Sequence, residues 1–191
     1  MQTTRRSSRR LSTRARVLTG IAAAAAVGAG TFGAVSATAS PAADQAAPVQ
    51  VGGGALTQSS HLSVDAATKV AQAALAAARK DGQKVTVAVV DRNGNTLVTL
   101  RGDGAGPQSY ESAQRKAYTA VSWNAPTSEL VKRLQQAPNL KDIPGTLFLP
   151  GGTPVQAKGA PVAGIGVAGA PSGDLDEKYA RAGAAELGTA K

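Results

Sequence analysis

An Asn-Gly dipeptide between two β-rich runs is the feature that most constrains how this chain folds. Asn93-Gly94 separates the runs at residues 85–91 and 96–101. Asn-Gly tolerates the positive φ angles of a type I′ turn, so the sequence predicts a tight β-hairpin here. The first run is largely apolar on both faces, which is typical of a strand covered on both sides.

The elements around this hairpin predict an α+β domain. A helical pattern before it begins after a capping Ser63 and ends at Asp81-Gly82. Asp174 and Glu177 form a capping-box pattern at the last helix. Helices are predicted at residues 64–80, 110–123, 128–136 and 174–187, and further strands at 146–149, 155–158 and 162–168. Hairpin-type connections imply an antiparallel sheet of about five strands packed with helices.

The N-terminal segment has the pattern of an export signal. An arginine-rich start is followed by an apolar, alanine-rich run at 17–35 and an Ala37-Thr38-Ala39 cleavage site. Ser8-Arg9-Arg10-Leu11 fits a twin-arginine signal, with a Sec signal as the alternative. We therefore expect a signal peptide at 1–39, a flexible tether at 40–60 and a domain at 61–191. The exported protein would be extracellular, either free or associated with the cell wall.

Charge and cysteine content exclude several classes of function. Six arginines lie in the leader, and from residue 40 onward 15 basic residues face 12 acidic ones, a net charge of +3. The high pI therefore does not indicate a nucleic-acid partner. The absence of cysteine excludes iron–sulfur clusters, cysteine zinc sites and cysteine nucleophiles.

Two catalytic or cofactor motifs fail on their context. Residues 164–169 match G-x-G-x-x-G, but the glycines lie within a predicted strand rather than between a strand and a helix. Glycines in a strand more often admit the close approach of a helix or ligand. The chain has one histidine, His61, and no G-x-S-x-G nucleophile elbow, so a serine hydrolase is not expected.

A metal site on the helix at 110–123 stays open. Glu111, Gln114 and Arg115 share one helix face at spacings of three and four residues. Residue spacing alone favours a surface ion pair between Glu111 and Arg115. The alternative is a shallow carboxylate site for iron ions, helped by His61 from another part of the surface.

A haem site would have an unusual ligand. Common axial ligands are His, Cys, Met and Tyr, but cysteine is absent and the one methionine is the initiator. The remaining candidates are His61, a hydroxyl such as that of Thr146, and the tyrosines Tyr110, Tyr118 and Tyr179.

The sequence resembles the GlcG/HbpS-type extracellular haem-binding proteins, in particular the secreted actinobacterial branch. The resemblance covers residues 62–187. It is carried by Val87-Ala88-Val89-Val90-Asp91 with Asn93-Gly94, Arg101-Gly102-Asp103-Gly104-Ala105, Lys116-Ala117-Tyr118-Thr119-Ala120, Pro126-Thr127, Pro150-Gly151-Gly152, the glycines of 164–169, and Asp176 with Ala180-Arg181-Ala182-Gly183.

This resemblance implies a profilin-like fold, a homo-oligomer with an octamer as the expected assembly, and haem and iron ions as ligands. It also implies signalling of haem or redox stress to a membrane sensor histidine kinase, or alternatively haem degradation or other small-molecule catalysis in the same fold. Thr146 would contact the haem iron, and Glu111 with Lys116 and His61 would form the iron surface. The chain departs from the family pattern at Gln114, where an E-x-x-E pair would have its second acid.

Overall fold

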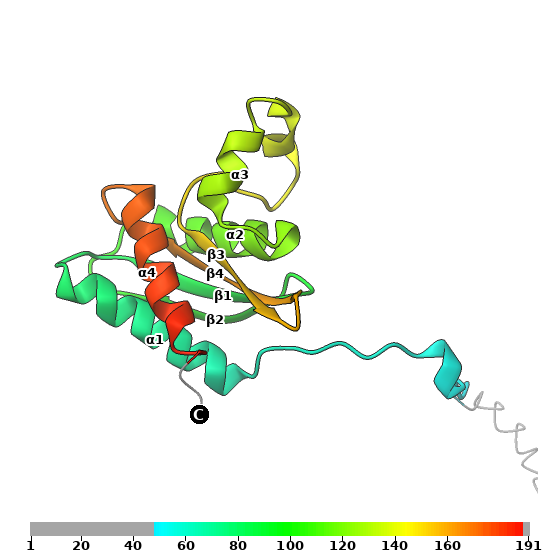
Figure 1. Cartoon of the computed structure of the whole chain (residues 1–191). Coiled ribbons are helices and arrows are strands. Elements are labelled where there is room, and N and C mark those ends of the chain that lie inside the picture. Colours follow the sequence, from blue (N-terminus) through cyan, green and yellow to red (C-terminus); the bar gives the residue numbers. More distant parts are fainter. Residues whose placement is uncertain (1–47, 189–191) are drawn as a thin grey trace, which may run out of the picture. The chain divides into compact units, whose positions relative to one another are not determined.

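A four-stranded antiparallel sheet with the order β2-β1-β4-β3 organises the protein (Figure 1). The structure is a computed structural model, and it describes residues 48–188. The predicted signal peptide lies outside these residues. The strands are β1 (Thr86–Asp91), β2 (Thr96–Arg101), β3 (Gly152–Ala157) and β4 (Ala160–Ala168). The predicted α+β fold is confirmed, with four strands in residues 48–188 instead of about five.

The hairpin of β1 and β2 forms where the Asn-Gly dipeptide predicts it, but its turn is of another type. Gly94 has φ +90°, whereas Asn93 is not among the described residues with positive φ. The Gly94 amide donates to the Asp91 carbonyl at 3.0 Å, which closes a four-residue turn from Asp91 to Gly94. Neither central residue of this turn has the positive φ that type I′ requires. The Asp91 carboxylate also accepts from the amides of Asn93 and Asn95, at 2.8 and 2.9 Å. That side chain removes the need for a type I′ turn.

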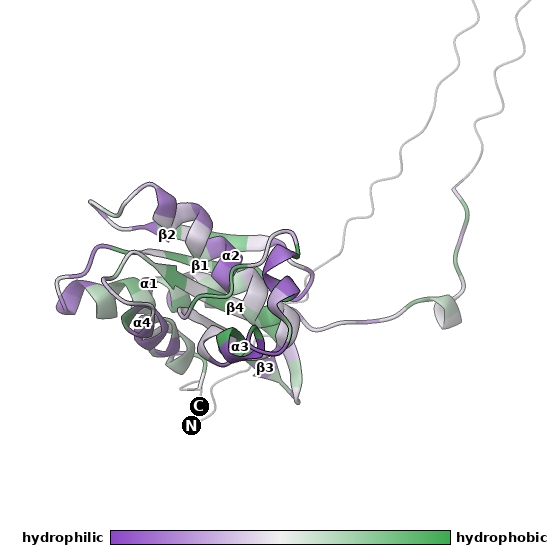
Figure 2. Ribbon diagram, turned by 90° about the horizontal axis from the view of Figure 1, so that it is seen from above, coloured by the Kyte–Doolittle hydropathy of each residue, from purple (hydrophilic) through white to green (hydrophobic). Residues whose placement is uncertain are grey.

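Two helices cover one face of the sheet and a third covers the other (Figure 1). Helix α1 (Val64–Lys80) begins after the Ser63 cap, as predicted, and lies beside α4 (Gly173–Ala185). Between them and the sheet lies the main core, which includes Val70, Val87, Ile165, Val167 and Tyr179. Figure 2 shows hydrophobic residues concentrated along the central strands β1 and β4.

Helix α2 (Gln108–Trp123) lies on the opposite face, unusually close to β4. A methyl group added to Gly166 would lie 2.0 Å from the Ala113 carbonyl oxygen, and one added to Gly164 would lie 2.1 Å from that of Ala117. The glycines therefore admit a helix backbone directly against the strand, as expected from their place in the sequence.

The segment between α2 and β3 differs most from expectation. Helix α3 spans Thr127–Arg133 and is followed by a 3-10 turn at Pro138–Asp142. Residues 146–149, predicted as a strand, have no regular structure. The Leu147 amide donates to the Thr119 hydroxyl at 2.8 Å, so a helix side chain takes the place of a strand neighbour.

Two smaller features complete the fold. The cap of α4 is Ser172, which accepts from Leu175 at 3.3 Å, so the predicted capping box starting at Asp174 is wrong. Within residues 48–188, every helix is too short or too polar to cross a bilayer.

Candidate functional site

A pocket of about 160 Å³ lies on the outer side of α2, beside the predicted haem ligand Thr146. The Tyr118 ring lies between two glycines with positive φ, Gly94 of the hairpin and Gly145 of the following loop. A methyl group added to Gly94 would lie 2.7 Å from this ring, and one on Gly145 would lie 3.6 Å from it. The complete lining is Val90, Gly94, Thr96, Gln114, Arg115, Tyr118 and Gly145.

Thr146 follows this lining in the chain but is itself almost completely covered. Its residue exposure is 1%, and its hydroxyl donates to the Ile143 carbonyl at 2.7 Å. The Thr146 carbonyl accepts from Nη2 of Arg115, also at 2.7 Å. Contact between the Thr146 hydroxyl and a bound iron would therefore require the loop at 143–147 to open.

Arg115 joins two residues that the family resemblance assigns to different ligands. Its Nη1 lies 3.6 Å from Oε1 of Glu111, one helical turn earlier, while Nη2 holds Thr146. The ion pair between Glu111 and Arg115 that the spacing favours is therefore present. The Glu111 side chain is 76% exposed, so this pair is open to solvent and the carboxylate is accessible to a cation.

Lys116 does not share the surface of Glu111. Its ammonium lies 2.8 Å from Oδ2 of Asp176 on α4, with both side chains only 5% exposed. It also donates to the Val167 carbonyl at 3.1 Å. Burial raises the pKa of Asp176 even though the Lys116 ammonium counteracts it. The structure therefore places Lys116 in the packing between α2, the sheet and α4, away from the predicted iron surface.

His61 lies at the hairpin end of the sheet. Its Nδ1 is 3.9 Å from Oδ2 of Asp91, and its Nε2 is 2.7 Å from the Ser59 hydroxyl. No hydrogen bond or ion pair joins His61 to Glu111 anywhere in residues 48–188, and no three His, Cys, Asp or Glu side chains there form a metal-binding group. An iron surface at Glu111 would thus need ligands from another copy of the chain or from water.

The three tyrosines occupy very different environments. Tyr179 is fully buried, and burial followed by its hydrogen bond to Asp81 raises its pKa to about 12. Tyr110 is 47% exposed near the start of α2. Tyr118 alone among them lines the pocket beside Thr146. The sequence alone makes all three tyrosines candidate haem ligands, whereas the fold places only Tyr118 in this pocket.

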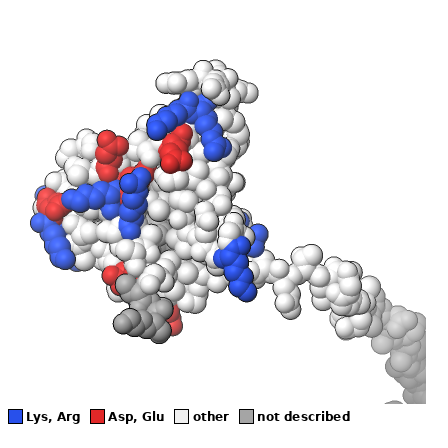
Figure 3. All heavy atoms as spheres, viewed as in Figure 1, with Lys and Arg blue, Asp and Glu red and all other residues white. Residues whose placement is uncertain are grey.

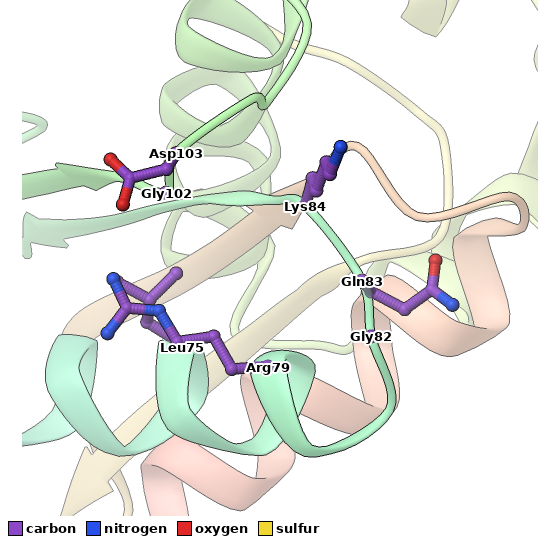
Figure 4. Close-up of a pocket in the computed structure, with 7 residues that line it drawn as sticks. All are labelled: Leu75, Arg79, Gly82, Gln83, Lys84, Gly102 and Asp103. Atoms are coloured by element: carbon purple, nitrogen blue, oxygen red, sulfur yellow. The ribbon is translucent and has the colours of Figure 1, made fainter.

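Other surface features are less specific. Charged side chains of both signs are scattered over the face seen in Figure 3, with wide uncharged areas between them. A second pocket, of about 250 Å³, lies between the C-terminal end of α1 and the loop after β2. Its cations Arg79 and Lys84 extend in different directions instead of converging on one point (Figure 4).

The fold and motifs agree with one protein family. A family model described as "Haem degrading protein HbpS-like" matches residues 62–185. The chain belongs to the HbpS-like family.

Solved structures support this membership. A double mutant of Streptomyces reticuli HbpS is 82% identical, with a TM-score of 0.73 over 74% of this chain and 97% of that chain. The ORFY protein of Klebsiella pneumoniae is 26% identical, with a TM-score of 0.66 over 71% and 97%. A PduOC:heme complex is 27% identical, with a TM-score of 0.61 over 66% and 94%.

A curated protein is also similar to this chain in sequence. An uncharacterised 15.0 kDa protein of Citrobacter freundii is 34% identical over 113 residues, which are 56% of this chain and 80% of that protein. Sequence alone does not reveal that Arg115 links Glu111 to the loop that carries Thr146. Its helix spacing to Glu111 was visible in the sequence, but its contact with a loop 31 residues later was not.

Proposed function

We propose that this chain is an exported haem- and iron-binding accessory protein that senses haem or redox stress. It would act on a membrane sensor histidine kinase. The observation that carries the proposal is membership of the HbpS-like family across residues 62–185, with 82% identity to Streptomyces reticuli HbpS. The heme complex of PduOC, a relative at 27% identity, supports haem as the ligand.

We expect haem to bind in the pocket beside Thr146, which Tyr118 lines. Tyr118 and Thr146 offer a phenol and a hydroxyl oxygen as possible ligands of the haem iron, and Tyr is a known axial ligand of haem. At about 160 Å³ the pocket is smaller than typical ligand sites of roughly 300 Å³ or more. A porphyrin would therefore be held at the surface, with Tyr118 and Thr146 as iron-contact candidates once the loop opens.

The assembly and the iron surface belong to the same proposal. A homo-oligomer, with an octamer as the expected form, would bring several copies of Glu111 together and supply the ligands that one chain lacks. The Streptomyces reticuli mutant replaces two glutamates three positions apart by aspartate, which is the spacing of Glu111 and Gln114. Because this chain has glutamine at the second position, we expect weaker iron binding there than at a paired acidic site.

Haemin titration of the mature protein tests the proposal. A Soret band distinct from that of free haemin should appear, and it should weaken in Thr146→Ala or Tyr118→Phe. Mass measurement of the same sample gives the size of the assembly. A spectrum identical to free haemin at every protein concentration would remove haem binding altogether.

Haem degradation is the second candidate, favoured by the description of the family as haem-degrading. It requires loss of the Soret band when reductant is added, together with release of iron or a bile pigment. A stable Soret band under those conditions leaves binding and sensing as the function. Sensing itself is tested by reconstituting the sensor kinase with haem-loaded and haem-free protein.

A further inference from the structure

Arg115 is the one charged side chain that lines the pocket beside Thr146. The remaining lining consists of Val90, Gly94, Thr96, Gln114, Tyr118 and Gly145, all uncharged. A single guanidinium among apolar and neutral groups is well suited to fix the orientation of a ligand through a carboxylate. The pocket therefore favours a mostly apolar molecule with an acidic group at one edge.

Arg115 already has two partners, but a ligand carboxylate could replace them. Its short hydrogen bond, at 2.7 Å, is to the neutral carbonyl of Thr146, and its ionic partner Glu111 lies farther away at 3.6 Å. The Arg115 side chain is 39% exposed, so a ligand can reach it without unfolding the helix. A ligand carboxylate would be a stronger partner than the carbonyl because both groups would then be charged.

Exchange of that partner would also loosen the loop. Two hydrogen bonds tie the loop to α2, one from Arg115 to the Thr146 carbonyl and one from the Leu147 amide to Thr119. Both bonds hold the same peptide group, because the Thr146 carbonyl carbon is bonded directly to the Leu147 nitrogen. Loss of the first therefore leaves this peptide group attached to α2 through Thr119 alone, and it loosens residues 143–146, where Gly145 lines the pocket and Thr146 is 1% exposed.

We propose that Arg115 binds the carboxylate of the pocket ligand and in the same step releases the Thr146 carbonyl. Binding of an acidic, planar ligand and loosening of residues 143–146 are then one event. This explains how a pocket of about 160 Å³ accepts a larger molecule, and how a covered hydroxyl becomes available. The inference rests on the proposed function, with haem propionates as the acidic groups.

The first test compares haemin with haemin dimethyl ester, in which both carboxylates are blocked. Arg115→Gln should weaken haemin binding by roughly 10- to 100-fold, the range for hydrogen bonds to charged groups. It should change binding of the ester by less than about threefold. Arg115→Lys should recover part of the loss, since lysine keeps the charge without the planar fork.

Arg79→Gln is the matched control, because it removes an exposed arginine from a different pocket (Figure 4). It should leave both affinities unchanged. Equal weakening of haemin and the ester by Arg115→Gln would overturn the inference, because the arginine would then act only on the shape of the pocket. Unchanged haemin binding in that variant would overturn it as well.

A second measurement follows the loop without relying on haem absorption. Amide hydrogen exchange at residues 145–147 should be faster in Arg115→Gln without ligand, and haemin should accelerate it in the wild-type protein but not further in the variant. Exchange that haemin leaves unchanged or slows in the wild type contradicts coupled opening. Failure of the wild type to bind haemin at all would instead refute the proposed function, so the two failures are distinguishable.

Discussion

Arg115 and Lys116 are neighbours in the sequence, yet they lie in opposite kinds of environment. Lys116 points into the protein, where its ammonium meets Asp176 at 2.8 Å and both side chains are 5% exposed. Arg115 points outward, where its guanidinium is shared between an exposed carboxylate at 3.6 Å and a loop carbonyl. One helix therefore has a fixed inner side and an exchangeable outer side.

The inner side is fixed because the carboxylates that lie there, Asp176 and Glu177, are almost completely buried. Asp176 accepts from the Ala170 amide with its other oxygen, and Glu177 accepts from Ser128 and Gly151 while pairing with Arg181. A buried charge that loses its partner costs several kcal/mol. The outer contacts can be replaced by water or ligand at little cost. Adaptable binding therefore belongs to the outer side.

Lys116→Ala is the strongest way to break this contrast. It leaves the Asp176 carboxylate buried without its cation, which costs about 3–5 kcal/mol of unfolding free energy. Urea denaturation of the purified protein measures the loss. The double variant Lys116→Met with Asp176→Asn removes both charges and should be clearly more stable than the single variant. If Lys116→Ala lowers the unfolding free energy by less than about 1 kcal/mol, as a surface substitution would, then the inner side is not fixed by this ion pair.

Gly166→Ala tests the backbone contact on the same side. The added methyl group would lie 2.0 Å from the Ala113 carbonyl oxygen, so α2 must shift away from β4. Overpacking of this kind typically costs about 1–3 kcal/mol. Gly188→Ala is the control, because its methyl group would meet only the Ala185 carbonyl oxygen, at 3.6 Å. Similar denaturation midpoints for the two variants would show that the seam between α2 and β4 is looser than described.

The sequence predicted the inner architecture better than the outer site. The hairpin, α1 and the packing glycines follow from local patterns, because turn residues, a serine cap and missing side chains act on their immediate neighbours. The irregular course of 146–149 could not be predicted, since it depends on a hydrogen bond from Leu147 to Thr119, 28 residues earlier. For the same reason Lys116 was predicted at the surface, although Asp176, 60 residues later, holds it inside.

The pH dependence of stability should have opposite signs at Asp176 and Asp91. The pKa of Asp176 is raised above its ordinary value of 3.8 by burial, so the folded state keeps a proton that the unfolded state releases. Its contribution to stability therefore falls as the pH rises from about 3.8 through the raised value.

At Asp91, burial acts to raise the pKa, but hydrogen bonds from Asn95 and Asn93 outweigh it and hold the pKa below 3.8. This contribution is present above 3.8 and is lost as the pH falls through the lowered value. Urea midpoints of wild type, Asp176→Asn and Asp91→Asn, measured from about pH 3 to about pH 6, show both trends as differences from wild type. Parallel curves for the two variants would contradict the assignment.

Glu111→Gln should have the smallest effect on stability and thereby sharpen the contrast with Lys116. The carboxylate is 76% exposed and lies 3.6 Å from Arg115 within one helix, an arrangement worth at most about 0.5 kcal/mol and screened by salt. The difference from wild type in urea denaturation should therefore shrink further at about 1 M salt.

Binding of a divalent cation such as Mn²⁺ to Glu111→Gln, followed by electron paramagnetic resonance, should nevertheless weaken, because the accessible carboxylate is gone. Glu129→Gln, which neutralises an exposed acid in the first turn of α3, is the control and should leave cation binding unchanged. A loss of more than about 1 kcal/mol in Glu111→Gln would place Glu111 with the fixed groups of the inner side instead.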